Sequence, residues 1–264
     1  MKTSHPVATS CAAALLVSLC TVSVARATDA GSSSAGDLEA TPYRPTASNP
    51  ADLPVPHHFE WEAGGLAERD RPGERHNSVP YLLKYAFDAD FGILVGGESF
   101  VSERSDGHLA KGWGDTSVTA KFHHAVSSST ALGLEAGANL PTASNGLGAG
   151  HTDFTLNGIV STEAAGCDVD INVNYTRLGV ADAGTSRELM GWAIAASHDI
   201  AQKWGLAGEL SGTDQRGTRG QAQFLGALSF AAAPTLVFDG GALFGLNRDS
   251  PRYGLFAGVT MLVR

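Results

Sequence analysis

Apolar and polar residues alternate strictly through most of this chain, most clearly between Gly114 and Glu163. From Leu132 to Leu140, leucine and alanine occupy every second position, and glycine, glutamate and asparagine occupy the positions between them. A period of two is that of a β-strand, which turns successive side chains to opposite faces. The alternation therefore predicts strands with one apolar face and one polar face.

The same alternation recurs from residue 58 to the end of the sequence and predicts twelve strands. Short connections, such as 127–129, alternate with long ones rich in Gly, Ser and Asn, such as 141–150. The expected strands lie at about 58–66, 79–88, 90–101, 114–126, 130–141, 151–163, 168–179, 187–199, 203–214, 220–231, 235–246 and 252–264.

Two architectures fit such a pattern, a soluble sandwich with an apolar core and an outer-membrane barrel with an apolar exterior. The strand number is even, and the strand lengths suit the roughly 9–11 residues that cross a bilayer. Aromatic residues also gather near strand ends, as in an interfacial girdle. The last predicted strand can pair with the first and leave no open edge. We therefore predict an all-β chain that forms a transmembrane, antiparallel, up-and-down β-barrel of about twelve strands.

Three regions are expected, with the barrel at residues 58–264. Residues 1–27 read as a cleavable signal peptide that ends in Ala25-Arg26-Ala27. Residues 28–57 are rich in Pro and Ser and form either a flexible periplasmic segment or a plug of the barrel. This order predicts export to the outer membrane of a Gram-negative cell. Short turns would face the periplasm and long loops the outside, so the expected surroundings are membrane lipid and lipopolysaccharide.

Charge and cysteine content narrow the classes of partner. Removal of residues 1–27 takes away Lys2 and Arg26 and no acidic residue, so the net charge falls from −9 to −11. An exported chain this acidic is not expected to bind nucleic acid. Only Cys167 lies beyond the signal, so no internal disulfide is expected.

The histidines do not predict a metal site. His123 and His124 are adjacent on a predicted strand and so point to opposite faces, and no histidine pair has zinc-ligand spacing with a third ligand. We expect no cofactor, no metal and no catalytic residue. An outer-membrane lipid hydrolase remains an alternative, although no serine, histidine and acid stand at spacings that bring them together within one strand. Nothing in the sequence decides the oligomeric state.

Polar residues of the inward parity are the candidate lumen lining. Acidic groups outnumber basic ones among them, which favours cations or neutral polar solutes over anions. A twelve-stranded barrel lies between the filled and the open sizes, so both a narrow pore and a filled interior stay open. The candidate residues are Lys84, Glu98, Asp115, Lys121, Glu135, Asn139, Asp153, Asn157, Asp170, Glu209 and Asp239.

Several short motifs, in this order, resemble an outer-membrane family named for the MetA pathway of phenol degradation. They are Phe59-Glu60-Trp61-Glu62-Ala63-Gly64, Gly114-Asp115, Leu140-Pro141-Thr142, Gly148-Ala149-Gly150-His151-Thr152-Asp153, Pro251-Arg252-Tyr253 and Phe256-Ala257-Gly258-Val259. The resemblance implies an outer-membrane transporter for small organic, including aromatic or hydrophobic, molecules and implies no catalytic residues. The expected function is thus passive passage of a small-molecule solute, with a lipid hydrolase or a structural or recognition barrel with a closed lumen as alternatives.

Overall fold

The computed structural model describes residues 38–263, apart from 71–73, 106 and 145. The expected signal peptide at residues 1–27 lies outside the described part of the chain. None of the described segments forms a helix long and apolar enough to cross a membrane.

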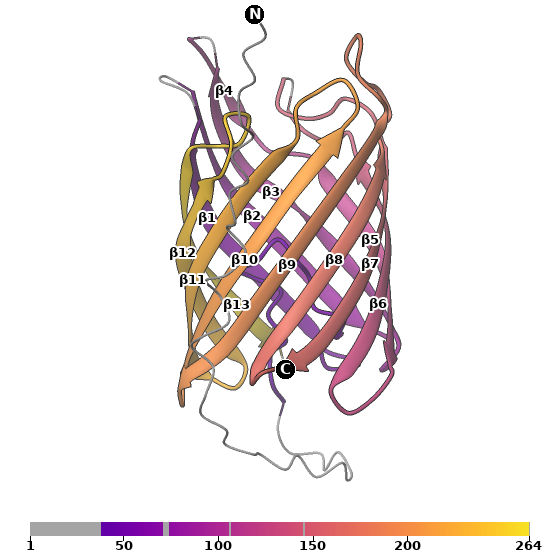
Figure 1. Ribbon diagram of the computed structural model, residues 1–264, viewed down its shortest axis with the longest axis vertical. Coiled ribbons are helices and arrows are strands. Elements are labelled where there is room, and N and C mark those ends of the chain that lie inside the picture. The colour runs from indigo at the N-terminus through magenta and orange to yellow at the C-terminus, as the bar shows by residue number, and fades with distance from the viewer. Residues whose placement is uncertain (1–37, 71–73, 106, 145, 264) are drawn as a thin grey trace, which may run out of the picture.

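Thirteen strands account for most of the described residues (Figure 1). They are β1 (Phe59–Arg69), β2 (Arg75–Ala86), β3 (Phe91–Ser105), β4 (His108–Gly112), β5 (Thr116–Ala125), β6 (Thr130–Leu140), β7 (Asp153–Ala164), β8 (Cys167–Arg177), β9 (Glu188–Ala201), β10 (Trp204–Gln215), β11 (Gln221–Ala233), β12 (Leu236–Gly245) and β13 (Tyr253–Val263).

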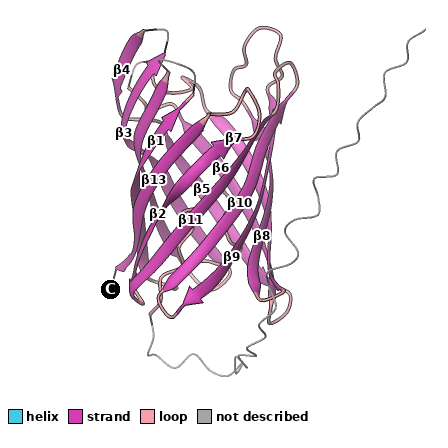
Figure 2. Cartoon of the chain, turned by 60° about the vertical axis from the view of Figure 1, so that its left-hand side comes forward, coloured by secondary structure: helices cyan, strands magenta, loops and turns pink. Residues whose placement is uncertain are grey.

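Twelve of these strands close into one antiparallel barrel, as the alternation predicts. Each wall strand pairs with its neighbour in the chain, and β1 pairs with β13 from Phe59↔Val263 to Arg69↔Tyr253. This pairing leaves the wall without an open edge. The tilted strands are seen from two sides in Figures 1 and 2.

Strand β4 is the difference from the sequence-based expectation, which assigned residues 102–114 to a loop. β3 is long enough to pair with β5 along its first half and with β4 along its second, from Val101↔Gly112 to Ser105↔His108. Gly107 adopts φ +80°, a left-handed conformation that glycine takes without steric cost and that allows the tight reversal. The β3–β4 hairpin therefore extends the wall at one rim (Figure 2).

The two faces of the wall have opposite character. Apolar side chains such as Phe122, Leu134 and Ile194 are about half exposed on the outer surface, whereas Lys84 and Lys121 are wholly buried on the inner one. A soluble protein would bury the first set and expose the second. An exposed apolar exterior around a polar interior is the arrangement of a transmembrane barrel.

The rims also differ. The rim that carries the short connections, for example between β5 and β6, is called the turn end, and the opposite rim is called the loop end. Residues 38–56, called the lumen segment, enter at the turn end, where the Ala40 amide donates to the carbonyl of Pro234. The segment returns to the same end, where Pro56 bridges to Ala86 just before β1. Between these points it runs inside the wall (Figure 1).

Candidate functional site in the barrel lumen

The lumen segment is held by side chains of the wall through its own backbone. Six backbone amides in the segment, those of Thr41, Tyr43, Arg44, Ser48, Asn49 and Ala51, donate hydrogen bonds to wall side chains. Prolines interrupt this run and have no N–H to satisfy. A buried amide needs a partner, and here the barrel supplies it in place of a neighbouring strand.

Two buried lysines flank the ring of Tyr43. The ammonium groups of Lys84 and Lys121 lie 3.8 and 4.0 Å from the ring centroid. Each lysine also donates to a carbonyl of the lumen segment, Lys84 to Thr41 and Lys121 to Pro50, both at 2.6 Å. Cation–π contacts strengthen when water is excluded, so the two lysines hold the Tyr43 ring, and with it the lumen segment, against the wall.

Carboxylates of the wall balance these lysines. Glu60 and Glu62 each bring an oxygen to 2.5 Å from the Lys84 ammonium, and Glu135 lies 3.2 Å from that of Lys121. Glu62 also accepts the Tyr43 and Arg44 amides. A buried charge is tolerated only when it is paired and hydrogen-bonded, and these groups meet both conditions.

Arg44 makes a second anchor on the other side of the lumen. Its guanidinium donates through two nitrogens, each 3.1 Å from an oxygen of Asp239 on β12. Gly64 and Gly258 face the same guanidinium, and a Cβ built on Gly64 would lie 2.6 Å from it. Glycine at these two inward positions therefore leaves the space that the arginine occupies.

The segment is anchored again at its innermost residues. Glu209 accepts both the amide and the hydroxyl of Ser48, at 2.7 and 2.9 Å. Asn49 reaches two other strands, because its side-chain amide donates to Glu135 and its backbone exchanges two hydrogen bonds with the Asn172 amide. Wall groups from β6, β8 and β10 thus converge on two consecutive residues.

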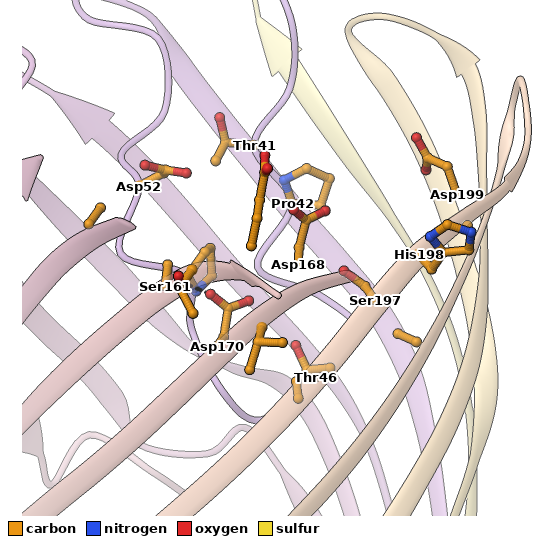
Figure 3. A pocket seen from close by; sticks show the side chains of 18 of the residues that line it. Thr41, Pro42, Thr46, Asp52, Ser161, Asp168, Asp170, Ser197, His198 and Asp199 are labelled. Carbon is orange, nitrogen blue, oxygen red and sulfur yellow. Dashed lines mark hydrogen bonds between the residues drawn. The ribbon is translucent and has the colours of Figure 1, made fainter. Parts of the chain in front are cut away.

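A cavity of about 630 Å³ lies beside the lumen segment at the turn end. Its lining includes Thr41 and Asp52 of the segment and carboxylates of the wall, among them Asp168, Asp170 and Asp199 (Figure 3). These acidic groups favour cations and neutral solutes over anions in this part of the lumen. Within the described residues, no group of three or more His, Cys, Asp or Glu side chains is arranged to hold a metal ion.

The eleven residues predicted to line the lumen fall into three places in the structure. Lys84, Lys121, Glu135, Glu209 and Asp239 contact the lumen segment, and Asn157 bonds to Glu135 beside them. Asp170 lines the turn-end cavity and accepts a hydrogen bond from Ser161.

The remaining four support the loop end. Glu98 bonds to His76. Asp115 accepts the Ala143 and Ala149 amides and the Asn139 side chain, and Asp153 accepts the Gly179 amide. The carboxylates of Asp115 and Asp153 thus hold loop amides, which the alternation alone does not reveal.

The predicted lining omits the residues of the lumen segment itself and the wall residues Glu60, Glu62 and Asn172. Alternation puts these three wall residues on the inward parity but does not say which inward groups meet the segment. A signal for the segment is present in its composition. Tyr43 and Arg44 are the only aromatic and the only basic residue between Thr28 and Pro56, in a stretch otherwise made of small, acidic, asparagine, leucine, valine and proline residues.

Comparisons with known proteins agree with the fold. A family model described as "Putative MetA-pathway of phenol degradation" matches residues 43–263, which includes most of the lumen segment. An outer-membrane channel from Pseudomonas putida F1 shares the fold with a TM-score of 0.63 and 14% identity, over 88% of this chain and 100% of that one.

Two porins resemble the structure less closely. The NanC porin has a TM-score of 0.56 and 8% identity over 77% of this chain and 98% of its own. The KdgM porin has a TM-score of 0.54 and 11% identity over 78% and 99%. None of the curated proteins compared with the sequence matches it.

Proposed function

Because the chain belongs to the MetA-pathway family of phenol degradation, we propose that it is an outer-membrane channel through which small organic molecules pass passively. Residues 1–27 would direct its export and then be removed. The favoured solutes are neutral or cationic, because carboxylates outnumber basic groups along the inner wall. The family's description adds small aromatic molecules to this class. Passage by diffusion needs no cofactor and no catalytic group.

The observation that carries this proposal is the interior of the barrel. A polar inner wall surrounds a segment that is itself hydrogen-bonded to that wall rather than packed in an apolar core. Each neutral hydrogen bond of this kind contributes only about 0.5–1.5 kcal/mol net, because its donor and acceptor can bond to water when the segment is displaced. We therefore assign the lumen segment as a plug that narrows the channel and whose displacement widens it.

A lipid hydrolase is the less favoured alternative. Hydrolases of this type need a serine hydrogen-bonded to a histidine. Over the described residues, no serine hydroxyl bonds to a histidine ring, and the rings of His76 and His198 bond instead to Glu98 and to the carbonyl of Gly166. No observation therefore favours this chemistry over diffusion.

Liposome swelling tests the proposal. Vesicles containing the full chain should swell slowly in a small neutral solute such as glycerol, and a variant that lacks residues 38–56 should swell faster and admit larger sugars. A matched variant that shortens a long loop, by removing residues 180–184, should behave like the full chain. If neither the full chain nor the variant without its plug admits any solute, the channel function is wrong.

A further inference from the structure

On the loop-end side of the plug lies a second cavity, of about 190 Å³, whose lining contains no ionisable side chain. Carboxamides and hydroxyls from β7, β8, β10 and β11 face it, including Asn157, Asn174, Ser211 and Gln223. Gly191 and Ala193 of β9 add small residues to the lining, and the Asn174 amide lies against Gly191. The contrast with the acidic turn-end cavity is sharp, because the two cavities lie in one lumen on either side of the same segment.

The orientation of one carboxamide in this lining is fixed by the plug. The Asn49 backbone donates its N–H to Asn172 Oδ1 and accepts from Asn172 Nδ2, which sets the orientation of the Asn172 amide. Asn157 Nδ2 then donates to Asn172 Oδ1 and to Glu135, both at 2.9 Å. An amide nitrogen can only donate, so the second atom, Asn157 Oδ1, must be the acceptor.

That acceptor has no partner. Asn157 is 8% exposed, and its Oδ1 is buried without a hydrogen bond to any described residue. The Asn174 amide, across the β7–β8 pair, likewise makes no hydrogen bond to another described residue. The Asn174 amide lines the cavity, so its oxygen can accept a hydrogen bond from a solute there. The buried Asn157 Oδ1 is a second unmatched acceptor next to this lining, and buried polar atoms are nearly always satisfied.

An apolar surface adjoins the carboxamides. Ala47 of the lumen segment and Ala193 of β9 belong to the same lining and supply methyl groups between the amides. A solute in the cavity can thus place a hydroxyl or N–H among the amides and turn an apolar face toward these alanines. A charged group would meet no counter-charge in the lining and would lose its hydration.

We infer that this cavity is the solute-selective site of the channel and that it binds an uncharged molecule carrying a hydrogen-bond donor and an apolar face. This inference rests on the proposed function and specifies its substrate class. Its size restricts the occupant to a molecule of a few heavy atoms, because sites for drug-sized ligands are usually at least about 300 Å³.

Binding can be measured without transport. The full chain is placed in nanodiscs, and the dissociation constants of three ring compounds of similar size are measured by equilibrium dialysis against empty nanodiscs. Phenol is neutral and has a donor, anisole is neutral and lacks a donor, and benzoate is an anion. Phenol should bind at least about five-fold more tightly than either, the factor that one hydrogen bond typically contributes.

Two variants test the site itself. Asn174→Leu and Gln223→Leu remove a carboxamide with little change in size, and each should weaken phenol binding about five-fold. Asn139→Leu makes the same change on the lumen wall outside this cavity and should leave phenol binding unchanged. The folded state of each barrel is checked by its heat-dependent shift in gel mobility.

Three results would overturn the inference. The first is that anisole or benzoate binds as tightly as phenol. The second is that phenol binding is unchanged in both Asn174→Leu and Gln223→Leu. The third is that Asn139→Leu weakens phenol binding as much as these two variants do. The proposed function fails separately, because an absence of swelling in the liposome assay can accompany intact phenol binding in nanodiscs.

Discussion

The ion pair between Arg44 and Asp239 should control how often the proposed plug, residues 38–56, is displaced from the lumen. Asp239 is 3% exposed and Arg44 17%, and two donated hydrogen bonds of 3.1 Å join them. Replacement of Asp239 by asparagine removes the charge but keeps the size and one acceptor. The guanidinium then stays in a largely buried site without its counter-charge, which is the costly outcome for such a pair.

The magnitude follows from the type of bond. Hydrogen bonds to charged groups are each worth about 1.5–3 kcal/mol, and the remaining asparagine oxygen recovers part of this. We expect Asp239→Asn to weaken plug docking by about 2–3 kcal/mol. This corresponds to about a 30- to 150-fold increase in the ratio of the displaced to the docked state.

Single-channel recording in a planar bilayer measures that ratio directly. The ratio of the times spent in the high- and the low-conductance state should rise by the stated factor, and the high-conductance state should match the conductance of the variant without residues 38–56. Glu188→Gln is the matched control, because it breaks an ion pair with Arg177 in which both partners are more than half exposed. Such a pair is worth about 0–1 kcal/mol, so the recording should not change.

A double variant completes the test. Arg44→Met with Asp239→Asn removes both charges and leaves no unpaired ion, so its effect should be smaller than the sum of the two single effects. Strict additivity would mean that the two side chains do not act on each other. An unchanged high-conductance fraction in Asp239→Asn, with a clear increase on removal of the plug, would refute the role of this pair.

Two further predictions concern single positions on the wall. Gly258→Ala should raise the high-conductance fraction as Asp239→Asn does, because the three atoms nearest to the new Cβ all belong to the Arg44 guanidinium; Gly65→Ala, where a Cβ meets nothing within 4 Å, should match the unaltered protein in the same recording. Leu134→Arg, in the middle of β6 on the outer face, should lower the free energy of unfolding by about 2–4 kcal/mol in guanidinium titrations of the vesicle-bound barrel. Phe154→Arg, near the loop end of β7, should cost only about 0–1 kcal/mol, and equal costs at the two positions would contradict the membrane depth assigned to them.

The period-two alternation predicted the wall because the sequence of each strand by itself determines which of its side chains face outward and which face inward. A residue two positions along a strand faces the same way, so Leu132 and Leu134 point outward, and Glu135 points inward, whatever the neighbouring strand is. The alternation of short and long connections also predicted that the strands follow one another around the barrel in the order of the chain. Strand β4 was not predicted, because its five residues lie beyond the apolar band and so show no contrast between an apolar and a polar face.

The sequence by itself determined the barrel, its twelve wall strands, its two faces and the excess of acid inside. Only the tertiary structure decided what the inward side chains do. Arg44 and Asp239 are 195 residues apart, and Ser48 and Glu209 are 161 apart. No local period connects such positions; closure of the sheet brings them together. Alternation gives Glu135 and Asp115 the same inward face, and only the folded positions of their partners show that Glu135 contacts the lumen segment and Asp115 holds a loop.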